Sequence, residues 1–239
     1  MSDSLVIIPT YNEIENVEKM IRTVFALPHV FDVLIVDDNS PDQTANKVKE
    51  LQKEFSNQLF LIERQGKLGL GTAYITGFKF ALEKNYDYIF EMDCDFSHNP
   101  NDLIKLYGAC HTDGYDVAVG SRYVSDGGFR NWPLFRVFLS KFASFYVETI
   151  LSLGVKDSTA GFVCYTKKVL QTLDLDNIKF IGYVFQIEMK FKAKQHGFSI
   201  KEVPIIFTDR VLGQSKMSKN IINEAVWGVW KLRKEKIKS

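Results

Sequence analysis

The feature that most constrains the fold of this chain is the alternation of short apolar runs with amphipathic stretches over residues 5–92. Residues 5–8 are apolar and end at Pro9, and residues 13–27 carry apolar side chains at helical spacing. The same pair recurs, with apolar runs at 33–36, 59–63 and 88–92 and helical patterns at 44–55 and 72–84. Strands that alternate with helices of this length predict an α/β fold with a mostly parallel sheet and helices on both faces.

Polar loops follow the four predicted strands. They cover residues 9–13, 37–42, 66–71 and 93–98. In an open parallel sheet, ligands bind beyond the carboxyl ends of the strands. We therefore expect the four loops to converge on one crevice.

The second half of the chain has a different pattern. It contains a predicted strand, a Phe-rich helical region and a second strand that leads into a loop, at residues 117–120, 133–153 and 200–207. At 239 residues, the chain can bury one sizeable core, whereas two domains would both be small. We predict a single domain over residues 1–239.

Composition and charge exclude several classes of protein. Hydrophobic residues make up 46% and charged residues 25%, which is typical of soluble globular proteins and excludes fibrous and disordered classes. The formal net charge of +1 provides no overall field to attract a polyanion, so we expect no nucleic-acid partner.

Cysteine usage and hydropathy favour cytoplasmic synthesis. No basic region precedes the first apolar run, and charged residues interrupt the most hydrophobic stretch, so we expect neither a signal peptide nor a transmembrane helix. An odd number of cysteines without paired spacing favours a reducing compartment. The interrupting charges are Arg136, Lys141 and Glu148, and the cysteines are Cys94, Cys110 and Cys164.

Two carboxylates follow the fourth apolar run. Asp93 and Asp95 are separated by one residue, and together they could form an oxygen site suited to Mg²⁺ or Mn²⁺. Two protein ligands suffice for such a metal when substrate phosphates supply the rest. The alternative is that these acidic residues only begin a turn or cap a helix.

The remaining loops carry weaker signals. Residues 9–13 offer an aromatic ring and a carboxylate that could stack on a base and bond to its edge, and residues 37–42 offer acids for a ribose or base. Asp42 is better interpreted as a helix cap. The Gly-rich segment 66–71 matches neither the P-loop nor the dinucleotide fingerprint, which argues against an ATPase or a dehydrogenase.

Taken in order, these loops resemble those of glycosyltransferase family 2, whose members have the nucleotide-binding GT-A fold. Further segments are similar to signatures of the dolichol-phosphate and polyprenol-phosphate mannose synthases within that family. These segments are residues 120–123, 157–162, 182–186 and 209–216. The resemblance covers nearly the whole chain and implies a Rossmann-like mixed, mostly parallel sheet flanked by helices. It places a nucleotide-binding half at about 1–120 and an acceptor-binding half, with amphipathic helices, at about 121–239.

The resemblance also implies roles for individual residues. The nucleotide pocket would be formed by Pro9, Tyr11, Glu13, Val36, Asp38, Lys67, Asp93 and Cys94. The metal, Mg²⁺ or Mn²⁺, would be held by Asp93, Asp95 and Ser97, where many members have Gln at the last position. The acceptor phosphate would face Arg122, Arg136 and Ser140, and the catalytic residues would be Asp95, Arg210 and Lys216.

The implied reaction is inverting transfer of mannose from GDP-mannose to a polyprenyl (dolichyl-type) phosphate. Such an acceptor is already ionised at neutral pH, so the enzyme needs no general base, and Arg210 and Lys216 would stabilise the leaving diphosphate. One alternative is transfer of another sugar, for example from UDP-glucose, or transfer to a saccharide hydroxyl with Asp157 as the base. Another is a nucleotide-binding subunit without turnover.

Two segments bear on how the chain would meet a lipid. Phe135, Phe138, Phe142 and Phe145 share one helical face, which suits either the protein core or a helix lying in a membrane surface. Apolar and aromatic residues from Ile221 to Trp230 precede a basic tail that suits an anionic membrane. We expect peripheral attachment to the cytoplasmic face of a membrane, directly or through a membrane-anchoring partner.

Overall fold

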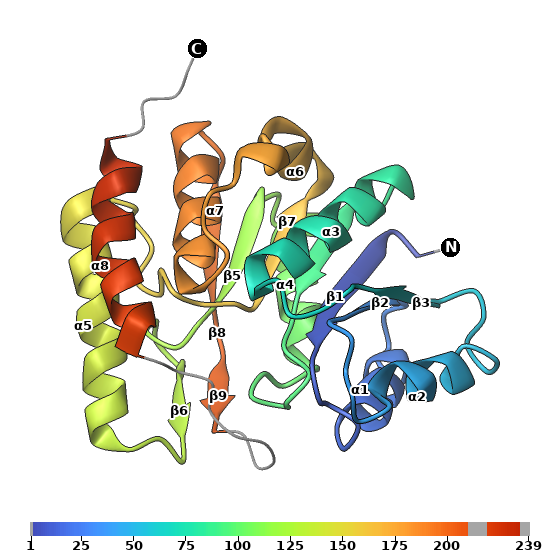
Figure 1. Ribbon diagram of the computed structural model, residues 1–239. Coiled ribbons are helices and arrows are strands. Elements are labelled where there is room, and N and C mark those ends of the chain that lie inside the picture. The colour runs from blue at the N-terminus through green and yellow to red at the C-terminus, as the bar shows by residue number, and fades with distance from the viewer. Residues whose placement is uncertain (1, 210–218, 235–239) are drawn as a thin grey trace.

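The computed structural model describes residues 2–209 and 219–234. Its main sheet has seven strands in the order β3-β2-β1-β4-β7-β5-β8, and β7 is the antiparallel one (Figure 1). The strands are β1 (Ser4–Thr10), β2 (Asp32–Asp37), β3 (Leu59–Glu63), β4 (Tyr88–Glu91), β5 (Val117–Ser121), β7 (Val163–Thr166) and β8 (Ile200–Pro204). The predicted α/β fold with a mostly parallel sheet is confirmed.

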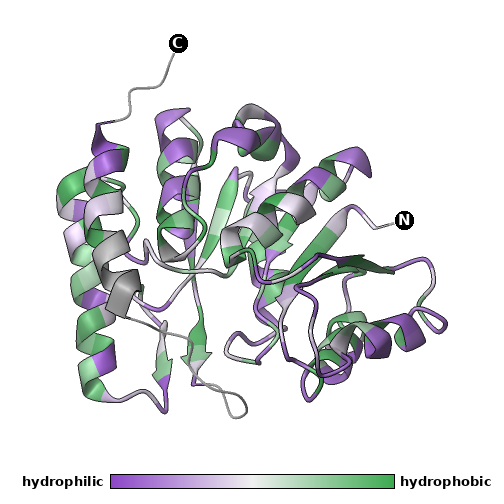
Figure 2. Ribbon diagram, viewed as in Figure 1, coloured by the Kyte–Doolittle hydropathy of each residue, from purple (hydrophilic) through white to green (hydrophobic). Residues whose placement is uncertain are grey.

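Helices cover both faces of this sheet because alternate strand residues point to opposite sides and both sides are apolar. One face packs against α1 (Val17–Phe25), α2 (Thr44–Leu51) and α4 (Asp102–His111). The other packs against α3 (Leu70–Glu83), α6 (Lys167–Thr172) and α7 (Tyr183–Gln195), with a 3₁₀ turn at Leu175–Asn177. The strands of the sheet are accordingly coloured as hydrophobic in Figure 2.

Two further helices lie beyond this core. They are α5 (Leu134–Leu151) and α8 (Lys219–Arg233). Val147, Val184 and Leu232 belong to a third cluster that joins them to α7. The helices α5 and α8 lie side by side (Figure 1), and the Tyr146 hydroxyl of α5 donates to the Val226 carbonyl of α8 at 3.1 Å.

A small second sheet pairs β6 (Gly128–Arg130) with β9 (Ile206–Thr208). The sequence predicted one strand over residues 200–207, and this prediction was wrong. The chain leaves the main sheet at Ile205, whose N–H donates to the Ser121 carbonyl while its own carbonyl accepts from Gly128. This crossing places β9 beside the loop after β4.

Candidate active site

The site lies where the strand order of the sheet reverses. From β1 the chain first adds β2 and β3 on one side, and β4 then pairs with the other side of β1. Ligands of open α/β sheets bind at such a switch point, outside the carboxyl ends of the strands. The loops after β1, β2 and β4 therefore share one edge of the sheet, as the sequence predicted.

Hydrogen bonds join the first two of these loops. Buried Asp37 accepts from the Thr10 hydroxyl at 2.8 Å and from the Ser40 hydroxyl at 2.6 Å. Ser40 in turn accepts from the Asn12 N–H, and Asp42 accepts from the Thr44 N–H at 3.0 Å. Asp42 therefore stabilises the turn before α2, while Asp37 joins the end of β1 to the loop after β2.

Four of the predicted nucleotide residues lie at the ends of β1 and β2 or in the loop that follows β1. Pro9, Tyr11 and Glu13 are half-buried, whereas Val36 is fully buried. The Lys67 ammonium lies 5.1 Å from the centre of the Tyr11 ring, at cation–π distance. This contact brings the loop after β3 to the loop after β1.

Asp38 is held by an arginine that the sequence analysis did not single out. Arg64 Nε donates to Asp38 Oδ1 at 2.6 Å, and Arg64 Nη1 donates to the Thr72 hydroxyl at 2.6 Å. Burial raises the pKa of the Asp38 carboxyl, and the Arg64 guanidinium partly offsets this effect. Arg64 follows β3 directly, at the edge of the sheet where functional residues were expected. This position in the sequence could have identified it as a site residue.

The Gly-rich segment serves packing. A Cβ on Gly71 would lie 2.8 Å from the Phe185 ring and 2.9 Å from the Phe180 carbonyl oxygen. Gly69 has a φ of +103° and lies against Ile181. The Gly71 N–H donates to the Ile181 carbonyl at 2.9 Å. These glycines let the loop before α7 approach the start of α3.

Asp93 and Asp95 follow β4 and are half-buried. Asp95 Oδ1 accepts from the Ser97 N–H at 3.0 Å, and the buried Ser97 accepts from the Thr208 N–H through its carbonyl at 3.1 Å. Burial raises the pKa of the Cys94 thiol well above its ordinary value, so this residue is a neutral thiol. The loop after β4 is thus hydrogen-bonded to β9.

These residues fit a divalent metal that is completed by substrate. Within residues 2–209 and 219–234, no three His, Cys, Asp or Glu side chains group as a metal site. Two half-buried carboxylates beyond the carboxyl end of a strand match the way Mg²⁺ is held by one or two protein carboxylates and phosphate oxygens. Asp93 and Asp95 would supply the protein ligands.

A buried polar network lies next to β4, the strand that leads to Asp93. Glu91 accepts from the Gln186 amide at 2.7 Å, and Lys190 donates to the Ala160 carbonyl at 2.7 Å and to the Gln186 carbonyl at 3.0 Å. Burial raises the pKa of Glu91 to about 8 and lowers the pKa of Lys190 to about 8. The network links β4, which leads to Asp93, with the loop at Ala160 and with α7.

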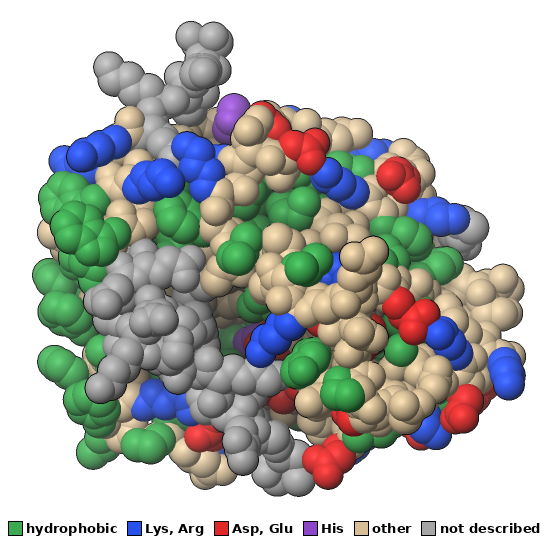
Figure 3. All heavy atoms as spheres, in the orientation of Figure 1, with side chains coloured by type: hydrophobic (Ala, Val, Ile, Leu, Met, Phe, Trp, Pro, Cys, Tyr) green, Lys and Arg blue, Asp and Glu red, His purple; other side chains and the backbone are tan. Residues whose placement is uncertain are grey.

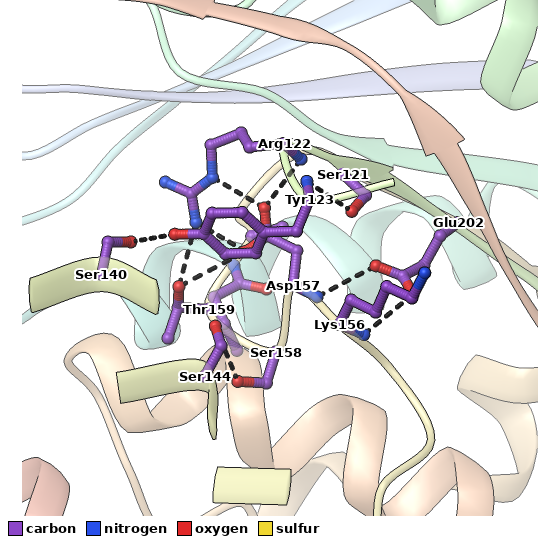
Figure 4. Close-up of polar contacts among 12 residues, drawn as sticks. Ser121, Arg122, Tyr123, Ser140, Ser144, Lys156, Asp157, Ser158, Thr159 and Glu202 are labelled. Carbon is purple, nitrogen blue, oxygen red and sulfur yellow. Dashed lines mark hydrogen bonds and ion pairs between the residues drawn. The ribbon is translucent and has the colours of Figure 1, made fainter. Parts of the chain in front are cut away.

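Arg122, predicted to face the acceptor, is bound to Asp157 (Figure 4). Its Nε donates to Asp157 Oδ2 at 2.7 Å and its Nη2 to Oδ1 at 2.6 Å. Asp157 is fully buried, and its backbone N–H donates to Glu202. Four rings lie 5.4–5.7 Å from the Arg122 Cζ, those of Tyr123, Phe129, Trp132 and Phe207. A carboxylate so enclosed is badly placed to act as a general base.

The other two predicted acceptor residues lie on α5. Arg136 Nη1 donates to Asp209 at 2.9 Å, and the Arg136 Cζ lies 4.2 Å from the centre of the Trp132 ring. Ser140 accepts from the Tyr123 hydroxyl at 2.6 Å (Figure 4). A cavity of about 510 Å³ is lined by Arg122 and Tyr123 together with Lys141, Ser144 and Phe145 of α5, whereas Arg136 and Ser140 are not part of its lining. Arg210 and Lys216 lie outside the described residues.

The four phenylalanines on α5 are exposed, so of the two alternatives left open by the sequence, the protein core is excluded. Phe135, Phe138, Phe142 and Phe145 expose 76, 68, 55 and 69% of their surfaces. On the neighbouring α8, Trp227 is 75% exposed. Among the described helices, none is both long and apolar enough to cross a bilayer.

Comparisons with solved structures identify the fold. A mannosyltransferase from Pyrobaculum calidifontis, solved with GDP-mannose and Mn²⁺, matches 97% of this chain with a TM-score of 0.63 and 15% identity, and this chain spans 62% of its length. Glucosyl-3-phosphoglycerate synthase from Mycobacterium tuberculosis, solved with Mn²⁺, UDP-glucose and glycerol 3-phosphate, matches 95% of this chain and 77% of its own, with a TM-score of 0.65 and 15% identity. The fold is that of the GT-A glycosyltransferases, and both of these solved structures contain Mn²⁺.

Sequence comparisons establish the family. The pattern described as "Glycosyl transferase family 2" matches residues 5–174. Polyprenol monophosphomannose synthase of Mycolicibacterium smegmatis is 45% identical over 233 residues, which cover 96% of this chain and 87% of that protein. Undecaprenyl-phosphate mannosyltransferase of Micrococcus luteus is 43% identical over 231 residues, 94% of this chain and 93% of that protein. The chain is therefore a glycosyltransferase and belongs to glycosyltransferase family 2.

Proposed function

We propose that this enzyme transfers mannose from GDP-mannose to a polyprenyl phosphate with inversion at the anomeric carbon. The observation that carries the proposal is the 45% identity to polyprenol monophosphomannose synthase over 96% of the chain. The geometry agrees with it, because two carboxylates suited to a diphosphate-bound metal follow β4, and Arg136, which suits a phosphate, is joined through Asp209 and the neighbouring Thr208 to the loop that carries them.

The proposed mechanism requires alignment and charge stabilisation. The acceptor phosphate oxygen attacks the anomeric carbon, the bond to the GDP oxygen breaks, and GDP leaves with the electron pair. A Mg²⁺ or Mn²⁺ ion on Asp93 and Asp95 would neutralise charge on the departing diphosphate. Arg136 and Ser140 would orient the acceptor, and Arg210 and Lys216 would bind the leaving group.

The structure argues against Asp157 as the general base for a hydroxyl acceptor. A hydroxyl nucleophile needs a general base, and Asp157 was the carboxylate considered for that role. Asp157 is fully buried and engaged by both Nε and Nη2 of Arg122. A phosphate acceptor avoids this requirement because it is ionised before it binds.

A transfer assay tests the proposal. Purified protein with Mg²⁺ or Mn²⁺ is incubated with a short-chain polyprenyl phosphate and either GDP-mannose or UDP-glucose, and with the unphosphorylated polyprenol as a second acceptor. We expect a β-linked mannosyl phosphate from GDP-mannose and the phosphorylated acceptor alone. A product from UDP-glucose only, an α-linked product, or efficient transfer to the free alcohol would refute the proposal.

We also propose that α5 and α8 bind the cytoplasmic surface of an anionic membrane. Exposed rings of α5 lie along the flank of the molecule, and hydrophobic side chains gather there in Figure 3. Lys231, Arg233 and Lys234 follow at the end of α8, and Lys141 lies on α5. Apolar side chains that enter the acyl boundary, together with cations at the headgroups, are typical of interfacial helices. Three buried free cysteines favour the reducing side of the membrane.

Vesicle sedimentation tests this attachment. We expect the wild-type protein to bind phosphatidylglycerol vesicles and Phe138→Ser/Phe142→Ser to bind them at least tenfold more weakly. Val30→Ser, which removes a side chain that is 56% exposed outside α5 and α8, is the matched control and should bind normally. Equal vesicle binding by all three proteins would contradict direct attachment through α5, and wild-type failure to bind would favour a membrane-anchoring partner.

A further inference from the structure

We propose that Asp209 is an internal competitor for the acceptor phosphate, because its carboxylate holds the arginine that the phosphate must bind. The inference rests on the proposed function, which assigns Arg136 to the acceptor. Carboxylate and phosphate oxygens present the same charge-assisted hydrogen bond to a guanidinium. In the structure, Arg136 Nη1 donates to Asp209 Oδ1 at 2.9 Å.

The backbone places Asp209 beside Arg136 independently of their ion pair. The Asp209 N–H donates to the Arg130 carbonyl at 3.0 Å, which extends the pairing of β6 with β9 by one residue. The Thr208 N–H donates to the Ser97 carbonyl at 3.1 Å. Asp209 is therefore fixed between the loop after β4, which carries Asp93 and Asp95, and the start of α5. This is the boundary between the proposed donor and acceptor sides.

The ion pair is suited to exchange. The side chains of Arg136 and Asp209 are 28% and 30% exposed, and one hydrogen bond joins them. By contrast, the Arg122 and Asp157 side chains are 9% and 0% exposed and are joined by two bonds. A partly exposed pair is weak enough for a phosphate to displace, whereas an enclosed bidentate pair is not.

Trp132 would keep Arg136 in place during the exchange. Its ring centre lies 4.2 Å from the Arg136 Cζ, which is within cation–π range. Loss of the Asp209 carboxylate would therefore leave the guanidinium positioned for the acceptor. Removal of the competitor should then tighten acceptor binding.

The test compares Asp209→Asn with the wild-type enzyme, in binding of farnesyl phosphate by calorimetry and in steady-state kinetics. From the range measured for exposed ion pairs, we expect the acceptor Kd and KM to fall about 1.5- to fivefold, with the KM for GDP-mannose unchanged. Weaker or unchanged acceptor binding would overturn the inference, since weaker binding would make Asp209 a brace for Arg136. Asp209→Ser provides a second variant, and both are checked by circular dichroism.

A double-mutant cycle with Arg136→Gln separates the two proposals. If Arg136→Gln weakens acceptor binding and Asp209→Asn has no effect in that background, competition for Arg136 is supported. If Arg136→Gln weakens binding but Asp209→Asn does not tighten it, the inference fails and the proposed function stands. If Arg136→Gln leaves acceptor binding unchanged, the assignment of Arg136 fails, and the inference with it. Asp113→Asn, which breaks the exposed pair with Lys201, controls for general loss of negative charge.

Discussion

Replacement of Asp157 by asparagine tests whether the Arg122–Asp157 pair is structural. The substitution keeps the shape of the side chain but removes the charge that balances a guanidinium with only 9% exposure. Asp157 accepts bonds from Nε, Nη2 and the backbone N–H of Arg122 at 2.7, 2.6 and 3.0 Å. An asparagine has a single acceptor oxygen, so its amide nitrogen would face a donor.

Removal of one partner of a buried ion pair typically costs about 3–5 kcal/mol, because the other charge stays buried. For a protein of this size, each kcal/mol lowers the unfolding midpoint by about 2–4 °C, so we expect a fall of roughly 6–20 °C. The measurement is thermal and urea unfolding followed by circular dichroism, with Asp113→Asn as the control at an exposed pair worth at most about 1 kcal/mol. A change for Asp157→Asn no larger than that of the control would refute the reasoning.

Three further predictions concern packing, the metal and pH. Gly77→Ala should destabilise the protein by about 1–3 kcal/mol in urea unfolding, since its Cβ would lie 2.6 Å from Ile7 Cγ2. Gly108→Ala has open space and should stabilise by about 0.5–1 kcal/mol. Asp93→Asn should abolish transfer and make calorimetric GDP-mannose binding insensitive to Mn²⁺; a retained metal effect would exclude Asp93 as a ligand. Burial raises the pKa of Asp32 above its ordinary 3.8, so the stability that its protonated form provides is lost as pH rises through the folded-state pKa. The free energy of unfolding of Asp32→Asn relative to wild type should therefore increase as pH rises above 3.8, and a flat difference would contradict this.

The sequence predicted the fold wherever the signal was local. Apolar runs ending in polar loops identified β1 to β4. The central positions of β1 and β2 are apolar because these strands are buried on both faces. The resemblance implied a mixed sheet, but no local pattern identified β7 as its antiparallel strand, because the direction of pairing depends on contacts between distant segments. The apolar pattern of residues 200–207 likewise predicts one strand, although the chain passes from the main sheet to the small sheet at Ile205. This change depends on contacts with Ser121 and Gly128, which are distant in the sequence.

Much the same division applies to the site. Asp93 and Asp95 were found because they follow a buried strand directly, and their place at the switch point follows from the alternation of elements. The partners of the other charged residues were not found, because Arg64 lies 26 residues from Asp38 and Asp209 lies 73 residues from Arg136. No local pattern encodes such pairs.

The sequence by itself therefore determined the alternation of strands and helices from β1 to β4, the loops that carry the chemistry and the family of the enzyme. Only the tertiary structure decided that Asp157 is enclosed, that Arg136 shares its charge with Asp209 and that the phenylalanines of α5 face outward. The physical reason is that burial and ion pairing are properties of the packed chain. A helical stripe of Phe138 and Phe142 looks the same in sequence whether protein or solvent covers it.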